Sequence, residues 1–225
     1  GAKHDMIGTF MAKPFFGHNG SGMHVHQSLW KDGVNVFYDD SDPNKISETI
    51  RQFIAGQLKR AKEMMLVLNS WPNSYKRLVP GYEAPTLCAW GFKNRSSQIR
   101  VPNFFNNKNA ARCEIRSPDG SGNIYLQLAV LLAAGLEGIE KNMTPPAPVD
   151  VNLFNVSDEE LEKMGVEYLP GSMYLALQEM KKSTWIKEVL SEAAYNALFN
   201  AKWEENKLAS AQVSEWELAR YSNKI

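Results

Sequence analysis

The spacing of apolar positions divides the chain into a strand-rich part, about residues 1–120, and a helical part, about residues 121–225. In the first part, short apolar runs alternate with Gly, Asn and Pro turns, a pattern typical of strands. Predicted strands occupy residues 9–16, 23–30, 86–94, 98–102 and 111–118. Asp32-Gly33 predicts a tight hairpin within 30–38.

Helical periodicity begins at Ser47, from where apolar residues recur every three or four positions to about Asn69. Residues 123–139 are almost continuously apolar, which predicts a helix buried nearly all round and ended by Gly135 or Gly138. A capping box and three or four amphipathic helices complete the pattern, with the box at Ser157 and Glu160 and the helices within 172–221. We therefore expect an α+β fold, a curved antiparallel sheet backed by helices, with a helical C-terminal region.

Composition narrows the class of protein. Of 225 residues, 44% are hydrophobic and 22% charged, as in ordinary globular domains. The 25 basic residues equal the 25 acidic ones, so no basic excess indicates nucleic acid or an anionic membrane as a partner. The two cysteines form no CxxC pair, and no signal-like or membrane-spanning apolar run occurs, so a cytoplasmic location is expected.

The segment "GHNGSGMHVHQSL", residues 17–29, concentrates candidate chemistry. His24 and His26 are two positions apart on a predicted strand and share one face, so they could ligate a metal, hold a phosphate or be structural. The preceding glycines allow backbone N–H groups to approach an anion or substrate closely. Asn19 can both donate and accept through its amide.

Five arginines form a second constellation, namely Arg77, Arg95, Arg100, Arg112 and Arg116. Either they lie on an exposed sheet face with cross-strand ion pairs, or they gather to bind anionic ligands, which their number relative to nearby acids favours. Glu114 shares this face and could join a histidine in holding Mg²⁺ or Mn²⁺. Glu83 lies between prolines on a loop that could close over a cleft.

Four segments resemble type I glutamine synthetases: "NGSGMHVHQSL", "NSYKRLVPGYEAP", "NRSSQIRVP" and "CEIRSPDGSGNIYLQLAVLLAAGLEGI". The resemblance implies that residues 1–225 are a single, truncated catalytic domain of the glutamine synthetase/guanido kinase-like type, its C-terminal part. The family's other glutamate metal ligands lie upstream of the position corresponding to residue 1. The resemblance therefore implies a fragment that is inactive in isolation.

By the same resemblance, each candidate residue takes a role. The metal ligands, for Mg²⁺ or Mn²⁺, are His24 and Glu114. The residues that bind the glutamate substrate are Asn19, Gly20, Arg77 and Arg116. The nucleotide-binding residues are His26, Ser28, Arg100 and Arg112. The catalytic residues are Glu83, Arg95 and Arg100.

The implied activity is that of a glutamate–ammonia ligase. ATP phosphorylates the γ-carboxylate of glutamate, and ammonia from ammonium then displaces phosphate. The parent protein is expected to be a homo-oligomeric dodecamer, which the fragment alone is not expected to form. Two alternatives stay open: a γ-glutamyl-amine ligase of the polyamine type, and a non-catalytic binding or regulatory protein with the same fold.

Overall fold

A four-stranded sheet with strand order β1-β6-β5-β4 lies at the centre of the computed structural model, which describes residues 1–105 and 107–224. Its strands are β1 (Val25–Gln27), β4 (Trp90–Phe92), β5 (Ile99–Val101) and β6 (Cys113–Ile115). The pairs β1–β6 and β5–β6 are antiparallel, as expected, but β4 and β5 run parallel. The sheet is therefore mixed, and the expected antiparallel pairing is wrong for β4 and β5.

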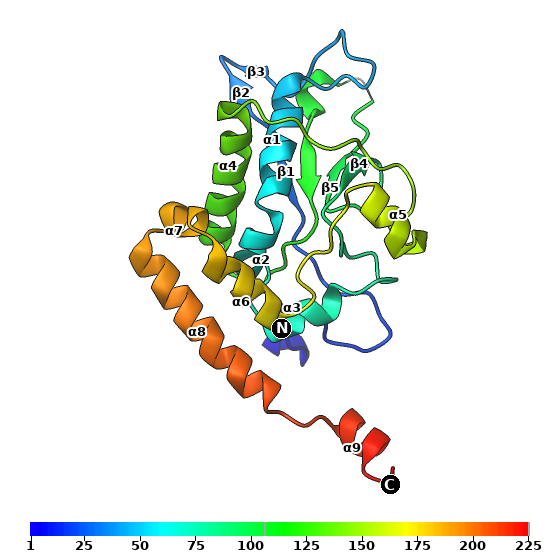
Figure 1. The fold of residues 1–225 in the computed structure, drawn as a ribbon, viewed down its shortest axis with the longest axis vertical. Coiled ribbons are helices and arrows are strands. Elements are labelled where there is room, and N and C mark those ends of the chain that lie inside the picture. The colour runs from blue at the N-terminus through cyan, green and yellow to red at the C-terminus, as the bar shows by residue number, and fades with distance from the viewer. Residues whose placement is uncertain (106, 225) are drawn as a thin grey trace.

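The register of the sheet separates an apolar face from a charged one. Ile99 lies opposite Ile115, and both side chains are fully buried in the core. The next pair along these strands, Arg100 and Glu114, points to the other face because side chains alternate along a strand. Three helices cover the apolar face, namely α1 (Glu48–Lys59), α2 (Ala61–Leu68) and α4 (Ile124–Glu140) (Figure 1).

The predicted strand at residues 9–16 is wrong, whereas the predicted hairpin is confirmed. Residues 9–16 form an irregular segment outside the sheet, in which Asn73 bonds both the N–H and the C=O of Lys13. At Lys13 the backbone therefore hydrogen-bonds to a side-chain amide instead of to a neighbouring strand. The hairpin joins β2 (Trp30–Lys31) to β3 (Val34–Asn35), and Asp32 and Gly33 have φ values of 51° and 76° in its turn.

The periodic segment 47–69 forms two helices, not one. They are α1 (Glu48–Lys59), whose first turn Ser47 caps, and α2 (Ala61–Leu68). Arg60 separates them with a φ of −98° and a ψ of 5°, away from helical values. Within the following proline-rich loop, Pro72 begins a short helix, α3 (Pro72–Arg77), at the position where proline is preferred.

Helix α4 (Ile124–Glu140) packs closely against α1. Gly135 and Gly138 lie inside α4, so the prediction that one of them ends it is wrong. A Cβ on Gly138 would lie 2.0 Å from the carbonyl oxygen of Gln52, so the glycine permits the close approach of the two helices. The prediction of burial nearly all round is also wrong, because one side of α4 is exposed.

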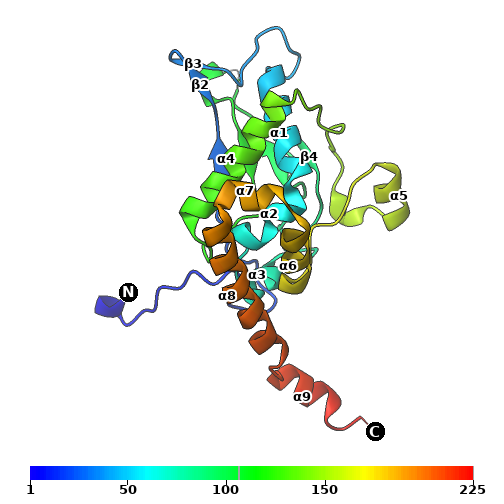
Figure 2. The ribbon, with the colours of Figure 1, turned by 60° about the vertical axis from the view of Figure 1, so that its left-hand side comes forward.

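The C-terminal part is helical, as predicted. Ser157 and Glu160 form the expected capping box at the start of α5. The helices are α5 (Asp158–Lys163), α6 (Met173–Lys182), α7 (Trp185–Leu190), α8 (Glu192–Ser210) and α9 (Glu215–Tyr221), and short 3₁₀ turns occur at η1 (Ala2–His4), η2 (Lys108–Ala110) and η3 (Leu153–Asn155). Helices α8 and α9 extend away from the sheet (Figures 1 and 2). No helix among the described residues is long and apolar enough to span a bilayer.

Candidate active site

The charged face of the sheet carries a row of three residues in register, His26, Glu114 and Arg100. Glu114 lies in the middle, and its side chain is 3% exposed. The Arg100 Nε donates to Glu114 Oε2 over 2.7 Å, and His24 Nδ1 lies 2.8 Å from Glu114 Oε1. Strand pairing thus brings a predicted metal ligand next to both histidines and a predicted catalytic arginine.

Glu114 is held as a carboxylate. Burial alone would raise its pKa, but the hydrogen bond with His24 and the charge of Arg100 outweigh burial and lower the pKa to about 2. Burial lowers the pKa of His26, against the opposing effect of Glu114. At neutral pH the row therefore combines a charged acceptor with a neutral imidazole.

His24 and Glu114 fit a divalent metal as two of its ligands. An imidazole nitrogen and a carboxylate oxygen suit Mn²⁺ and are acceptable to Mg²⁺, and both atoms already lie within hydrogen-bonding distance of each other. Among the described residues, no group of three or more His, Cys, Asp or Glu side chains is placed to hold a metal ion. His24 and Glu114 alone would therefore not complete the coordination of a divalent metal ion.

A cavity of about 210 Å³ adjoins this row. Its lining includes all four residues predicted to bind glutamate, together with the predicted flap residue and one predicted metal ligand; these are Asn19, Gly20, Arg77, Arg116, Glu83 and His24. Gly22, Tyr82 and Ala84 complete the lining and were not singled out from the sequence. One cavity is therefore surrounded by segments 19–24 and 77–84 and by Arg116, which directly follows β6.

Arg77 forms the floor of this cavity and is 3% exposed. Its guanidinium donates to the main-chain carbonyls of Arg116, Ser117 and Pro118, at 2.8, 2.8 and 3.2 Å. Burial lowers its pKa to about 10, against the opposing charge of Asp119. The guanidinium is therefore fixed in place before any ligand arrives.

Glycines in the 19–24 segment allow it to lie on Arg77. A Cβ on Gly22 would be 2.4 Å from Arg77 Nη2, and one on Gly20 would be 2.4 Å from the carbonyl oxygen of Ala12. Glycine is needed at these two positions because the chain lies too close to its neighbours for a side chain to fit. Their φ values are not in the left-handed region.

Arg116 holds the loop that carries Glu83. Its Nη2 donates to the main-chain oxygen of Glu83 over 3.0 Å, and its Nη1 donates to the main-chain oxygen of Arg95. Burial lowers the pKa of Arg116. The Glu83 side chain is 60% exposed, its φ is 54°, and its carboxylate lies 3.9 Å from Arg95. A strained, exposed carboxylate on an anchored loop suits a group that moves when a ligand binds.

Of the four predicted nucleotide-binding residues, His26 and Arg100 belong to the row, and Arg112 contacts His26. Arg112 Nε donates to His26 Nδ1 over 3.1 Å, and its Nη1 donates to the carbonyl oxygen of Ala110. Ser28 Oγ accepts a hydrogen bond from the indole of Trp30. None of the four predicted nucleotide-binding residues lines the 210 Å³ cavity. Arg95 lines a larger cavity, of about 550 Å³, that also includes Glu83.

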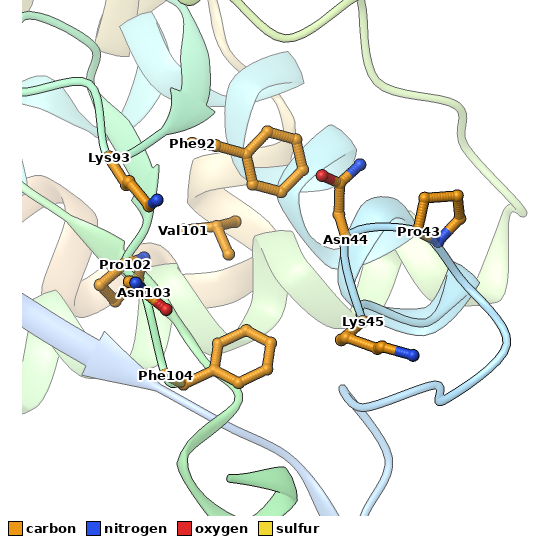
Figure 3. A pocket seen from close by; sticks show the side chains of 9 residues that line it. All are labelled: Pro43, Asn44, Lys45, Phe92, Lys93, Val101, Pro102, Asn103 and Phe104. Carbon is orange, nitrogen blue, oxygen red and sulfur yellow. The ribbon is translucent and has the colours of Figure 1, made fainter. Parts of the chain in front are cut away.

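A further cavity, of about 240 Å³, contains none of the predicted residues (Figure 3). Phe92, Val101 and Phe104 point into it from the sheet side, and the loop with Asn44 and Lys45 faces them. Val101 follows Arg100 on β5, so its side chain points to the opposite face of the sheet. This cavity is separate from the candidate active site.

Asp119 is a residue that the sequence did not single out. It is fully buried and near enough to Arg77 for its charge to act on the guanidinium, and its carboxylate accepts hydrogen bonds from Asn69 Nδ2 and from the N–H and hydroxyl of Ser121. The "SPDGSG" turn gave a signal, because aspartate in such a turn bonds the backbone two residues on. What the sequence could not show is that this turn lies under an arginine.

Comparison with known proteins identifies the family to which the chain belongs. The family model "Glutamine synthetase, catalytic domain" matches residues 1–221. Glutamine synthetase of Thermotoga maritima is 47% identical over 218 residues, 97% of this chain and 49% of that protein. For the Methanosarcina mazei enzyme the identity is 48%, over 95% of this chain and 47% of that protein.

Solved structures extend the match to the fold. Apo GmaS without ligand superposes with a TM-score of 0.83 at 33% identity, covering 99% of this chain and 49% of that chain. A GmaS/ADP complex superposes with a TM-score of 0.85 at 31% identity, covering 98% of this chain and 50% of that chain. The chain belongs to the glutamine synthetase catalytic-domain family.

The chain spans about half the length of the curated relatives that it matches. The family in general depends on ATP and a divalent metal, and uses ATP, glutamate and ammonia.

Proposed function

We propose that this chain forms about half of the active site of an ATP-dependent glutamate–ammonia ligase. One observation carries the proposal: the 210 Å³ cavity gathers Asn19, Gly20, Arg77 and Arg116 beside Glu83 and His24. These residues come from three segments between positions 19 and 116, and the cavity combines fixed cationic groups with an amide and an exposed carboxylate. That combination suits an amino acid that carries two carboxylates and one ammonium group.

The cationic groups of the cavity would bind the substrate carboxylates. Arg77 and Arg116 are both held by main-chain carbonyls, so neither must reorganise when an anion enters. Asn19 can accept from the substrate ammonium and donate to a carboxylate. Substrate glutamate would thus lie with its reactive γ-carboxylate toward His24, Glu114 and Arg100.

The chemistry then proceeds in two displacements. A γ-carboxylate oxygen attacks the γ-phosphorus of ATP and ADP leaves, giving a γ-glutamyl phosphate; ammonia attacks the acyl carbon and phosphate leaves. Arg95, Arg100 and Arg112 would stabilise the charge on the transferred phosphoryl group. A bound Mg²⁺ or Mn²⁺ ion, held in part by His24 and Glu114, would supply further charge neutralisation at the phosphate oxygens.

Glu83 would act on the amine. Its carboxylate can pair with incoming ammonium and accept one proton, leaving neutral ammonia to attack. Because the loop is anchored at its backbone by Arg116 while the carboxylate is exposed, closure of the side chain over the cavity would also exclude water from the acyl phosphate.

A γ-glutamyl-amine ligase is the second candidate. The 550 Å³ cavity, which Glu83 also lines, is larger than ammonium requires and has room for an alkylamine. Kinetic comparison of ammonium with methylamine and putrescine as acceptors distinguishes the two candidates. Homo-oligomeric assembly of the whole protein stays a prediction.

The test is a chimeric ligase in which this chain replaces the matched segment of the Thermotoga maritima relative. We expect the chimera to restore growth without glutamine to a strain that lacks glutamine synthetase, and the isolated chain not to do so. Glu83→Gln in the chimera should lower kcat about 100-fold or more, because the proton acceptor is lost. A well-folded chimera that forms no γ-glutamyl product from glutamate with any of the three amines would refute both candidate ligases.

A further inference from the structure

Lys13, in the irregular segment 9–16, contacts the loop that carries Glu83. Its ammonium nitrogen lies 3.7 Å from the centre of the Tyr82 ring, which is the arrangement of a cation–π contact. Tyr82 directly precedes Glu83 and lines the 210 Å³ cavity. A residue that does not itself line the cavity therefore holds the aromatic neighbour of the carboxylate that would act on the amine.

The backbone of Lys13 is fixed to helix α3. Asn73, on α3, donates to the carbonyl oxygen of Lys13 over 3.0 Å and accepts from its N–H over 2.8 Å. Arg77, the floor of the cavity, belongs to the same helix. Ala12, next to Lys13, is fully buried and accepts a hydrogen bond from the N–H of Ser21 over 2.8 Å. The elements that build the cavity therefore also set the position of Lys13.

The side chain of Lys13 joins two loops at the cavity. Besides facing the Tyr82 ring, its Nζ donates to the main-chain oxygen of His18, which directly precedes Asn19. An ammonium group carries three donors and a compact charge, so it can bond a carbonyl and face a ring at the same time. Lys13 thus connects the loop before Asn19 with the loop that carries Glu83.

The Glu83 loop has two cationic anchors, and neither of them uses the Glu83 carboxylate. Arg116 donates to the main-chain oxygen of Glu83, and Lys13 lies against the ring of the preceding residue. The Glu83 side chain is 60% exposed. The two contacts therefore hold the backbone of the loop and leave the carboxylate free to meet an amine.

We propose that Lys13 is a positioning residue for Glu83, acting through the ring of Tyr82. The inference rests on the proposed function. With the ring held, the loop keeps the Glu83 carboxylate beside the cavity, where it binds ammonium and shields the acyl phosphate from water. Without Lys13, the loop spends less time in that position, so the apparent affinity for ammonium falls by the same fraction. Water then attacks more of the acyl carbon, so that phosphate leaves and glutamate is regenerated.

The contact is tested first in this chain itself, independently of catalysis. Lysine is labelled with ¹³C at Cε, and the Lys13 signal is identified by its loss in Lys13→Met. We expect the Hε protons of Lys13 to resonate upfield, because they lie over an aromatic ring. Tyr82→Leu should return them to the ordinary lysine position, whereas Tyr82→Phe, which keeps the ring, should leave them upfield. A Lys13 signal at the ordinary position in the unsubstituted chain would overturn the inference.

The consequence for catalysis is tested in the chimeric ligase. Lys13→Met should raise KM for ammonium about threefold to fivefold, the factor expected for one partly exposed cation–π contact, and change kcat less than about twofold. It should also raise phosphate release from ATP and glutamate without an amine by a similar factor, and leave KM for ATP unchanged. Lys13→Arg should restore both values, because a guanidinium can lie over the same ring.

A double substitution distinguishes positioning from a general loss of structure. Lys13→Met combined with Tyr82→Leu should raise KM for ammonium no further than Tyr82→Leu alone, because both substitutions remove one contact. Lys181→Met, at an exposed position at the end of α6, is the matched control and should change neither KM for ammonium nor phosphate release. Circular dichroism establishes that each variant is folded.

Two kinetic results would overturn the inference while the proposed function stands. One is an active chimera in which Lys13→Met behaves like Lys181→Met. The other is an equal rise in KM for ammonium in Lys13→Met and Lys13→Arg, which would show that the cation over the ring is not what matters. An unsubstituted chimera without ligase activity would instead refute the proposed function, and the role of Lys13 with it.

Discussion

Arg100 and Glu114 face each other across β5 and β6, with the guanidinium Nε 2.7 Å from the carboxylate. The pair is a cross-strand ion pair, which the sequence left open, and it is also part of the candidate site, since His24 bonds the other oxygen of Glu114. The two interpretations of the arginine face therefore do not compete at this position. The ion pair keeps the carboxylate charged and oriented where a metal would need it.

Removing the charge of Glu114 should destabilise the chain by about 2–3 kcal/mol, because Arg100 would lose the partner that compensates its partial burial. Urea unfolding of Glu114→Gln measures this loss. Glu83→Gln is the control, since the Glu83 side chain is 60% exposed and should change the unfolding free energy little. Equal midpoints for the two variants would show that the ion pair contributes nothing to stability.

Arg77→Lys should lower both stability and activity, whereas Arg95→Lys should lower mainly activity. Lysine cannot reach the carbonyls of residues 116–118 with the fork of a guanidinium, so buried acceptors would lose their donors at a cost of about 2 kcal/mol. Arg95 has a side chain that is 69% exposed, and its replacement should cost less than about 0.5 kcal/mol. In the chimeric ligase both substitutions should lower activity.

Two outcomes would contradict the predictions for these two variants. If Arg95→Lys unfolds at the same urea concentration as the unsubstituted chain and retains full activity in the chimera, then Arg95 has no role at the phosphates. If Arg77→Lys is as stable as Arg95→Lys, then the carbonyl bonds of Arg77 do not fix the cavity floor.

Stability should fall at acid pH through Glu137. Its hydrogen bonds with Arg60, outweighing burial, lower its pKa to about 2 in the folded chain, compared with about 4.5 when unfolded. A depressed carboxyl pKa contributes stability that is fully present above pH about 4.5 and is lost as pH falls toward 2. We expect a contribution of about 2 kcal/mol, measured as the difference between the unsubstituted chain and Glu137→Gln in urea unfolding from pH 3 to 7.

The difference in unfolding free energy between the unsubstituted chain and Glu137→Gln should shrink steadily below pH 4.5, because protonation of Glu137 removes the same charge that the substitution removes. Glu162→Gln, at an exposed position, should show a small difference at every pH. A Glu137 difference that stays constant down to pH 3 would mean that the ion pair with Arg60 is not the source of the stability.

Much of the fold could be predicted from local pattern. The strand positions of β4, β5 and β6, the Asp32-Gly33 hairpin and the Ser157 capping box each depend on a few neighbouring residues. The parallel pairing of β4 with β5 could not be predicted, because strand order depends on contacts between distant segments. The continuous apolarity of residues 123–139 predicted burial nearly all round, but such a pattern does not show which side of α4 is exposed.

The candidate site divides in the same way. Alternation on β6 predicted that Arg112, Glu114 and Arg116 share a face, since a strand fixes that relationship. That Arg77 lies beneath Gly20 and Gly22, with its guanidinium on the carbonyls of residues 116–118, could not be predicted. Such a position depends on the packing of three separate segments. The place of Asp119 and Tyr82 at the site could not be predicted from the sequence for the same reason.

The contact between α1 and α4 makes the sharpest prediction for stability. Alanine is a better helix former than glycine by about 1 kcal/mol, so Gly138→Ala would stabilise an isolated helix. In this structure the new Cβ would lie 2.0 Å from the carbonyl oxygen of Gln52 and 2.7 Å from the backbone nitrogen of Gly56, both of them main-chain atoms that cannot rotate away. The helices must separate, so we expect a net loss of about 2–3 kcal/mol in thermal or urea unfolding. Gly171→Ala is the control, because a Cβ there meets nothing within 4 Å and its φ is not in the left-handed region. A Gly138→Ala chain at least as stable as Gly171→Ala would show that α1 and α4 are farther apart than the structure places them.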